Sequence, residues 1–264
     1  MEALIGHGRT ADVFRYGENK VIKVFHDEFE WLAYEEYAKD KNINNIGLPA
    51  PKAYDFIEID GKKGIVYEYV QGVSMLKLMQ RNPFKAARHA RLLADLHAEI
   101  HKKTLTSLPS IKASLAAMIQ KVQSVEQQKK DAIISYMNTL PDGLNLCHYD
   151  FHPDNVLIHD GDAKVIDWMT AGAGDPCVDV CRTCLILNSN ILPPNTSAIK
   201  GRLINSFRKI FYRSYINQYL KTTGIKMEDV DKWLLPVATA RLAEEIESET
   251  LFLNEIIAEK MLEL

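Results

Sequence analysis

The segment from His148 to Asn155, together with Asp167, constrains this chain more than any other feature of its sequence. The segment has the spacing His-x-Asp-x-x-x-x-Asn, and the apolar run Val165-Ile166 leads into Asp167 twelve residues later. Transfer of a phosphoryl group from a nucleotide requires an acidic group at the acceptor and oxygen ligands for a metal. Asp150 is therefore expected at an acceptor hydroxyl, as a base or as an orienting group. Asn155 and Asp167 are expected to bind Mg²⁺.

A glycine-containing loop near the start of the chain is a candidate for binding phosphate. Residues 6–13 have the form Gly-x-Gly-x-x-Ala-x-Val between two predicted strands, with Gly6, Gly8, Ala11 and Val13 at the defining positions. Missing side chains let backbone N–H groups approach phosphate oxygens closely. An ordinary β-turn is the alternative interpretation. A predicted β-hairpin rather than a helix follows the glycines, which disfavours a dinucleotide-binding loop.

Lys23 lies inside the apolar segment Val21–Phe25, ten residues after the glycine loop. A lysine in such a strand is either an outward-facing residue at a sheet edge or a ligand for phosphate, and the loop upstream favours the second interpretation. An ammonium group in this position needs a carboxylate partner. Glu36 on a predicted helix over 28–41 is the first candidate, and Glu35 is the alternate.

Glu68 and Val70 end an apolar strand just before a short joint at 71–74. Their backbone groups are candidates for hydrogen bonds to an adenine ring. A plain strand end explains the same residues, and the sequence does not separate the two interpretations.

The pattern of apolar residues predicts an α+β protein with two lobes. Residues 1–71 are expected to form strands and one helix, in which Trp31, Tyr34 and Ala38 have helical spacing. Residues 72–264 are expected to be mostly helical, with a β-hairpin over 156–166 that turns at Asp160-Gly161. The predicted helices of this second part cover 86–102, 110–138, 178–189, 198–221 and 228–262.

Composition excludes several classes of protein. Apolar residues make up 47% and charged residues 25%, as in ordinary globular proteins. No run of eighteen apolar residues occurs, and the first residues lack the pattern of a signal peptide, so a cytoplasmic protein without a membrane partner is expected. Residues 228–264 carry three basic and ten acidic side chains, which argues against a nucleic-acid partner.

We favour structural roles over functional ones for two smaller motifs. Cys177, Cys181 and Cys184 have helical spacing, but no further pair completes a zinc site, so they are expected to be buried apolar side chains. Asp175 and Asp179 precede or begin the predicted helix over 178–189, and both are expected to cap its N-terminus.

Together these residues resemble the aminoglycoside phosphotransferase and choline kinase superfamily, small-molecule relatives of the protein kinases. The resemblance covers most of residues 4–180 and includes Glu68-Tyr69-Val70-x-Gly72 and Leu96-His97-x-x-Ile100-His101. It implies a bilobal, protein-kinase-like fold, with an antiparallel N-lobe sheet and one helix, and a helical C-lobe with a small hairpin at the catalytic site. It also implies ATP or GTP with Mg²⁺ as cofactors, and Lys23 with Glu36 on the phosphates.

Three departures from the family pattern bear on function. Tyr149 stands where the family usually has glycine between His148 and Asp150. Asp167-Trp168-Met169 replaces the Asp-Phe-Gly of protein kinases. Asp175 follows Asp167 by only eight positions, and no Ala-Pro-Glu follows, so a protein substrate is disfavoured.

The leading hypothesis is an ATP-dependent phosphotransferase acting on a hydroxyl of a small molecule, with no protein partner evident. Glutamates near the C-terminus suggest an amine-bearing acceptor such as an aminoglycoside or amino alcohol, although a solvated helix face explains them equally well; they are Glu244, Glu247, Glu249, Glu255, Glu259 and Glu263. The alternative is a catalytically silent nucleotide-binding module of the same fold that regulates a partner. His148 and His152 are expected to support the loop around Asp150.

Overall fold

The computed structural model describes residues 2–189 and 196–264 and confirms the predicted α+β, kinase-like fold. The chain forms two compact units. The first contains the residues up to Leu78 together with Pro153–Thr170, and the second contains Met79–His152 and the chain after Thr170. Each is described by itself below. The lobe boundary expected after residue 71 stays a prediction.

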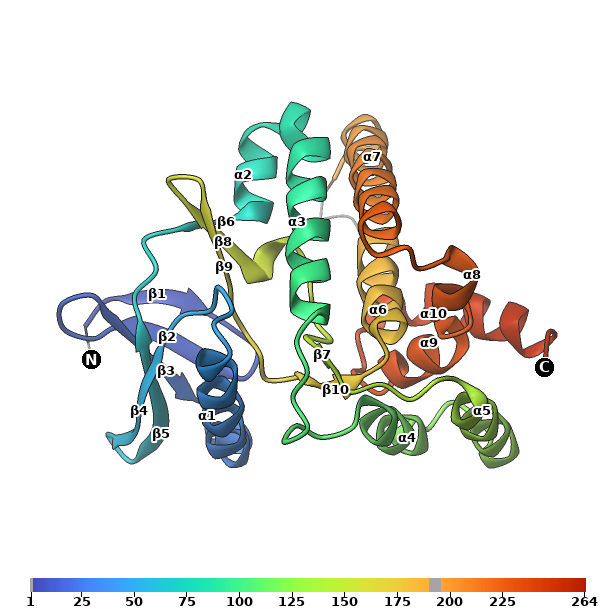
Figure 1. Ribbon diagram of the computed structural model, residues 1–264, viewed down its shortest axis with the longest axis horizontal. Helices are drawn as coiled ribbons and strands as arrows, with labels where there is room; N and C mark the ends of the chain where they lie inside the picture. Colours follow the sequence, from blue (N-terminus) through green and yellow to red (C-terminus); the bar gives the residue numbers. More distant parts are fainter. Residues whose placement is uncertain (1, 190–195) are drawn as a thin grey trace. The chain divides into compact units, whose positions relative to one another are not determined.

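The first unit is built on a five-stranded antiparallel sheet with the order β1-β2-β3-β5-β4 (Figure 1). The strands are β1 (Leu4–His7), β2 (Ala11–Arg15), β3 (Lys20–Phe25), β4 (Ala53–Ile59) and β5 (Lys62–Glu68). Asp60 and Gly61 turn the chain between β4 and β5 with φ angles of 51° and 78°. Such angles define the tight hairpin turn that this residue pair favours.

Helix α1 (Glu30–Asn45) packs against one face of this sheet. Side chains alternate between the two faces along a strand. Phe25 of β3 therefore joins Ala33 of α1 in one buried cluster, while Ile22 and Val24 belong to a second cluster with Val66. Lys23 has the parity of Phe25, so the alternation directs it to the face that α1 covers.

A second, three-stranded sheet completes the first unit. It has the order β6-β8-β9 and consists of β6 (Val73–Ser74), β8 (Val156–His159) and β9 (Asp162–Val165). The hairpin predicted over 156–166 is confirmed, and its turn residues Asp160 and Gly161 have φ angles of 49° and 95°.

The second unit is mostly helical. Helices α3 (Ala86–His101) and α7 (Ala198–Thr223) lie side by side along much of their length (Figure 1). The other elements are α2 (Met75–Arg81), which begins in the first unit, α4 (Ile111–Lys121), α5 (Gln127–Thr139), α6 (Pro176–Asn188), α8 (Met227–Asp231), α9 (Leu234–Leu242) and α10 (Glu247–Met261). A two-stranded sheet pairs β7 (Asn145–Cys147) with β10 (Gly172–Gly174). Single 3-10 turns lie at Asp27–Phe29, Pro83–Lys85 and Pro153–Asn155.

Two predicted helices are wrong in extent. The helix predicted over 110–138 is two helices, α4 and α5, separated by residues 122–126. The helix predicted over 228–262 is three, and the break before α10 falls at Glu245, whose φ of 54° lies in the left-handed region. A non-glycine residue in that conformation ends a right-handed helix, and its side chain gives no signal in the sequence.

The helical spacing of Trp31, Tyr34 and Ala38 does not mark the buried face of α1. Trp31 and Tyr34 are 67% and 66% exposed, whereas the buried residues of the helix are Ala33, Glu36, Asp40 and Ile43. The helix therefore directs two carboxylates, rather than its aromatic side chains, toward the sheet.

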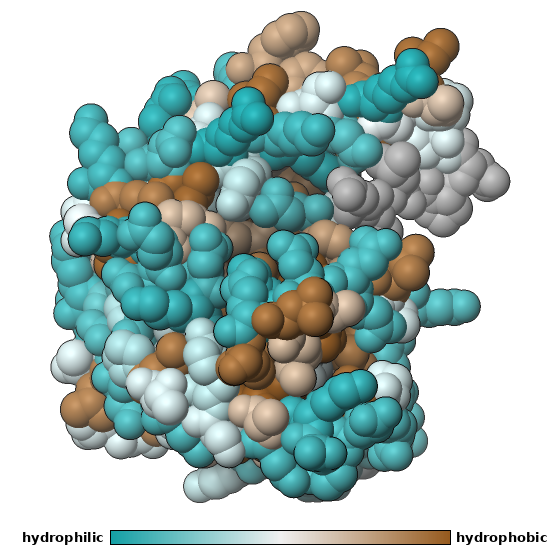
Figure 2. Space-filling view, turned by 90° about the vertical axis from the view of Figure 1, so that its right-hand side faces the viewer, coloured by the Kyte–Doolittle hydropathy of each residue, from teal (hydrophilic) through white to brown (hydrophobic). Residues whose placement is uncertain are grey.

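The surface and the cysteines agree with the composition. In the part of the chain that the structure describes, no helix is long and apolar enough to cross a membrane. Hydrophilic side chains cover most of the face in Figure 2, with apolar side chains in small groups between them. All four cysteines are buried and reduced, as expected of small apolar side chains.

Candidate active site

The glycine loop is the tight turn between β1 and β2. The Gly8 N–H donates to the Ala11 carbonyl at 3.0 Å, and a Cβ atom added to Gly8 would lie 3.0 Å from the same oxygen. Gly8 therefore permits a turn that a larger residue would strain. In the register of the sheet, Val13 pairs with Lys23, so the strand leaving the loop runs beside the lysine.

Lys23 is held by two carboxylates within the first unit. Its Nζ donates to Glu36 at 2.7 Å and 3.0 Å and to Asp167 at 3.2 Å. The structure thus pairs Lys23 with Glu36 of α1 rather than with Glu35, which is exposed. Burial alone would lower the pKa of Lys23, but the charges of Asp167 and Glu36 outweigh it and raise the pKa above the ordinary lysine value. The ammonium group stays charged at neutral pH.

Asp40 adds a third acidic group beside this pair. Burial and the nearby charge of Glu36 raise the pKa of Asp40 to about 8, while Tyr67 donates its hydroxyl to Asp40. The same hydroxyl lies 3.1 Å from Glu36. Asp40 is consequently a proton-bearing group near neutral pH, one helical turn from the carboxylate that binds Lys23.

Hydrogen bonds on both sides of Asp167 hold the segment that follows β9. The indole N–H of Trp168 donates to the Val165 carbonyl at 3.0 Å, and Lys39 of α1 donates to the Met169 carbonyl at 2.6 Å. Asp167 itself has a φ of 65°, a conformation that costs a non-glycine residue about 1 kcal/mol or more. Strain of this kind is held by surrounding contacts and is common at functional sites.

Asn155 lies at the same end of the β8–β9 hairpin as Asp167. The Ile166 N–H donates to the Asn155 carbonyl at 2.9 Å, directly before Asp167, and Asn155 is buried. The two residues supply amide and carboxylate oxygens, which are the donors that Mg²⁺ prefers. The donor set therefore fits a magnesium ion.

Glu68 and Val70 show less than the prediction required. The Glu68 carboxylate is bound by Lys164 of β9 at 2.5 Å, and the Val70 carbonyl accepts the Gly72 N–H at 2.7 Å. The side chain of Glu68 is thus structural. An adenine contact through the backbone of either residue stays a prediction.

In the second unit, the loop of residues 148–152 presents Asp150. The Asp150 side chain is 30% exposed, with His152 Nε2 3.5 Å and Arg182 Nη2 3.8 Å from its carboxylate oxygens. Burial would raise the pKa of Asp150, but His152, Arg182 and His148 together hold it well below its usual range. Asp150 is ionised at neutral pH and is a weak base.

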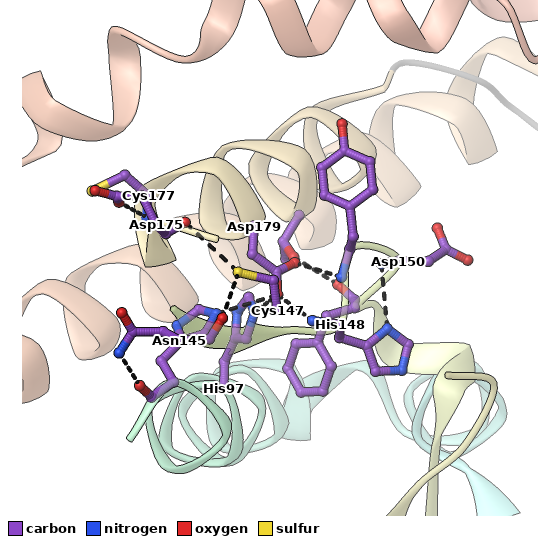
Figure 3. Close-up of polar contacts among 12 residues, drawn as sticks. His97, Asn145, Cys147, His148, Asp150, Asp175, Cys177 and Asp179 are labelled. Carbon is purple, nitrogen blue, oxygen red and sulfur yellow. Dashed lines mark hydrogen bonds and ion pairs between the residues drawn. The ribbon is translucent and has the colours of Figure 1, made fainter. Parts of the chain in front are cut away.

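Asp179 of α6 holds the loop of residues 148–152 through its backbone. Its carboxylate accepts the backbone N–H of His148 at 2.6 Å and that of Tyr149 at 3.0 Å (Figure 3). Asp150 points away from Asp179 in the same view. His97 and His101 of α3 each place Nε2 3.2 Å from Asp179, which is fully buried.

The expected cap role is wrong for Asp179 and right for Asp175. The Asp175 side chain accepts the Cys177 N–H at 2.7 Å and caps α6, whereas Asp179 lies one turn further into the helix. Burial opposes the charge of Asp179, but His97 and His101 depress its pKa far below the usual range. The same burial lowers the pKa of His97 to about 4, so that His97 is neutral beside a fixed negative charge.

Tyr149 departs from the family pattern in residue type, but its backbone has a conformation that glycine favours. Its φ is 61°, the left-handed conformation that a glycine adopts freely. The backbone is thus the one that glycine would favour, although the residue is tyrosine. The ring of Tyr149 is 4% exposed, and the Arg182 guanidinium lies 5.2 Å from its centre.

Arg182 and Asp179 are site residues that the sequence analysis missed in these roles. Arg182 binds Glu244 at 2.5 Å, and Arg241 binds both Glu244 and Glu249. Two of the C-terminal glutamates are therefore paired with arginines. The signal available beforehand was the helical spacing of Asp175, Asp179 and Arg182, which places charged residues on a helix face rich in apolar ones.

Comparisons with known proteins identify the family and the fold of the chain. The model of the phosphotransferase enzyme family known as APH matches residues 3–205. Acyl-CoA dehydrogenase family member 10 of Mus musculus is 25% identical over 224 residues, or 75% of this chain. The chain spans only 20% of the length of that curated relative.

Three solved structures share the fold. The aminoglycoside phosphotransferase APH(3'')-Id from Streptomyces rimosus has a TM-score of 0.61 and 14% identity, covering 87% of this chain and 89% of its own. The amicoumacin kinase hAmiN, solved with AMP-PNP, Ca²⁺ and Ami, has a TM-score of 0.62 and 14% identity, covering 97% and 88%. A choline kinase from Cryptosporidium parvum has a TM-score of 0.57 and 12% identity, covering 98% and 87%.

The fold is therefore that of the small-molecule phosphotransferases, and the resemblance seen in the sequence is confirmed. The family match covers more than half of the chain. The chain belongs to the phosphotransferase enzyme family.

Proposed function

We propose that this protein transfers the γ-phosphoryl group of ATP to a hydroxyl group of a small molecule. The observation that carries the proposal is Lys23, whose ammonium group is held by Glu36 at 2.7 Å and by Asp167 at 3.2 Å. A fixed cation beside a tight glycine turn suits a triphosphate.

The nucleotide roles follow from residues of the first unit. The backbone of the glycine loop, at Gly6 and Gly8, receives phosphate oxygens, and Lys23 neutralises their charge. Asn155 and Asp167 would hold Mg²⁺, which when bound would neutralise charge on the transferred group. The backbone at Glu68 and Val70 is assigned to the adenine ring. ATP and GTP carry the same triphosphate group, so both nucleotides should be tested for binding.

Asp150 acts on the acceptor. Its carboxylate accepts a hydrogen bond from the acceptor hydroxyl and orients the oxygen for attack. A base is most effective when its pKa lies near the working pH. Because the pKa of Asp150 is far lower, an orienting role is favoured over early removal of the proton.

A small molecule is the acceptor class that the chain supports. The segment between Asp167 and α6 is occupied by Trp168, Met169 and strand β10, which leaves no long loop to bind a polypeptide. Aminoglycosides and amino alcohols are the first acceptors to test, given the relatives. The pairing of Glu244 and Glu249 with arginines removes them as an argument for an amine.

The test has two stages. Calorimetry should detect uptake of ATP or GTP that depends on Mg²⁺, and a screen across aminoglycosides, choline, thiamine and sugar-like alcohols should identify a phosphorylated product. Asp150→Asn should lower transfer by about 100-fold or more, with nucleotide affinity within about twofold. Asp160→Asn, the same change in the exposed hairpin turn, is the matched control. Folded protein that binds nucleotide but phosphorylates no acceptor would favour the silent module instead.

A further inference from the structure

A line of alternating charges runs through the second unit from Asp150 to α10. Arg182 Nη2 lies 3.8 Å from Asp150 Oδ1 and 2.5 Å from Glu244 Oε1. The other oxygen of Glu244 accepts from Arg241 Nη1 at 3.1 Å, and Arg241 Nη2 donates to Glu249 at 2.7 Å. Three separate parts of the chain, at residues 150, 182 and 241–249, contribute to this line.

Most of these charges are buried. Arg182 is 3% exposed, Arg241 is 7% exposed and Glu249 is 5% exposed. Removing paired charges from water costs about as much as their attraction returns, so buried ion pairs are weak contributors to stability. These buried ion pairs are therefore better explained by the side chains that they position than by the stability that they add.

The contacts of Arg182 show what it holds. Two of its nitrogens, Nε and Nη1, are buried and have no hydrogen-bond partner among residues 2–189 and 196–264. The nitrogen that is used, Nη2, serves Glu244 and faces Asp150. The ring of Tyr149 lies 5.2 Å from the guanidinium carbon. The guanidinium is thus held through Nη2 by Glu244 and lies over the ring of Tyr149, while its two unsatisfied donors carry an energetic cost.

The separation between Arg182 and Asp150 matters for the chemistry. At 3.8 Å the two charges attract each other strongly, yet the distance is too long for a hydrogen bond. Arg182 therefore supplies positive charge without occupying a hydrogen-bonding position on the carboxylate. His152 and His148 also face Asp150. The arginine side chain keeps its charge at every working pH.

We propose that Arg182 is a positioning residue for Asp150, and that Glu244, itself fixed by Arg241, holds Arg182 in place. The acceptor role of Asp150 rests on the proposed function, whereas the electrostatic link between Arg182 and Asp150 does not. Tyr149 contributes to the same arrangement, because the Arg182 guanidinium carbon lies over its ring at 5.2 Å.

The first test measures the link directly and needs no acceptor. Carbon NMR of the aspartate carboxyl groups, with the Asp150 signal assigned from Asp150→Asn, gives the midpoint of its titration. In Arg182→Gln the midpoint should rise by about one pH unit, a tenfold gain in proton affinity. Arg182→Lys keeps the charge and should restore most of the difference. Arg213→Gln, an exposed arginine on α7, should leave the midpoint unchanged.

The second test separates positioning from general damage. Because Arg182→Gln removes one of the two arginines that bind Glu244, the double variant R182Q/E244Q removes both charges together and is the safer protein to fold. With Mg-ATP and the acceptor found by the screen, or water if none is found, kcat should fall by about tenfold to 100-fold. KM for ATP should change by less than about twofold.

Glu244→Gln alone should give part of the same loss, and the double variant should lose no more than Arg182→Gln, since Glu244 acts through Arg182. A folded R182Q/E244Q protein with the wild-type kcat and an unmoved Asp150 titration would overturn the proposal. Absence of any nucleotide turnover in the wild-type chain would overturn the proposed function, and the NMR titration would still decide the link.

Discussion

Replacing Asp179 with asparagine removes one charge and one acceptor from beneath the Asp150 loop. The native carboxylate accepts the backbone N–H groups of His148 and Tyr149, one on each oxygen. Asparagine is nearly the same size but keeps a single acceptor oxygen. One of the two N–H groups must then face an NH₂ group in a fully buried position.

The magnitude follows from these contacts. A hydrogen bond to a charged group contributes about 1.5–3 kcal/mol, and a buried donor left unsatisfied costs about 1–3 kcal/mol. We take about 3 kcal/mol for the sum, which is a large part of the stability of an ordinary domain. A change of this size corresponds to opening of the loop that is more frequent by about 100-fold.

Amide hydrogen exchange measures this opening at the two residues concerned. The amides of His148 and Tyr149 should exchange about 100-fold faster in Asp179→Asn than in the wild type at pH 7. Asp175→Asn is the matched control on the same helix, since asparagine caps a helix as well as aspartate. Its effect on the two amides should stay within about twofold.

The pH dependence has a definite sign. Because the folded pKa of Asp179 is depressed, its contribution is fully present above the unfolded value near 4 and is lost as the pH falls below it. The difference between the two proteins should therefore shrink in acid. Folded Asp179→Asn protein whose two amides exchange less than threefold faster at pH 7 would refute the anchoring role.

Three further predictions concern the remaining buried groups. Since the pKa of Asp40 is raised to about 8, the folded state binds its proton more tightly, and stability falls as the pH rises from about 4 to 8; Asp40→Asn should remove this slope and be the more stable protein at pH 9 by about 1–2 kcal/mol in urea unfolding. Lys23→Met should weaken Mg-ATP binding by about tenfold or more in calorimetry, whereas the exposed Lys20→Met on the same strand should bind normally. Tyr149→Phe removes a buried hydroxyl that has no hydrogen-bond partner among the described residues, so stability should stay equal or rise by up to about 1 kcal/mol, and a clear loss would reveal a partner.

The sequence predicted the features that depend on local patterns. The alternation along Val21–Phe25 is enough to place Lys23 on one face of the sheet with Phe25, and the pair Asp160-Gly161 is enough to predict a tight hairpin. The octapeptide spacing with Asp167 was enough to predict the family. These signals work because strand parity and turn conformation are set by a few neighbouring residues.

The features that were wrong or missed depend on contacts between distant segments. A carboxylate that is buried against a lysine cannot be told from a solvated one by spacing, so the sequence did not separate the buried carboxylates of α1 from its exposed ones. Asp179 meets His148 across 31 positions, and Arg182 meets Glu244 across 62. Residues with a left-handed backbone conformation, such as Glu245, end helices without being of a characteristic residue type.

Two of the polar contacts that helix α1 makes with the rest of the first unit join Glu36 to Lys23 of β3 and Lys39 to the Met169 carbonyl. The two contacts lie less than one helical turn apart, on a short rigid rod. A small roll of this rod would therefore release the lysine and the Asp167 segment in the same movement. A compound or protein that bound the exposed side of the helix, at Trp31 and Tyr34, and displaced it would change the positions of Lys23 and Asp167 without contacting either residue.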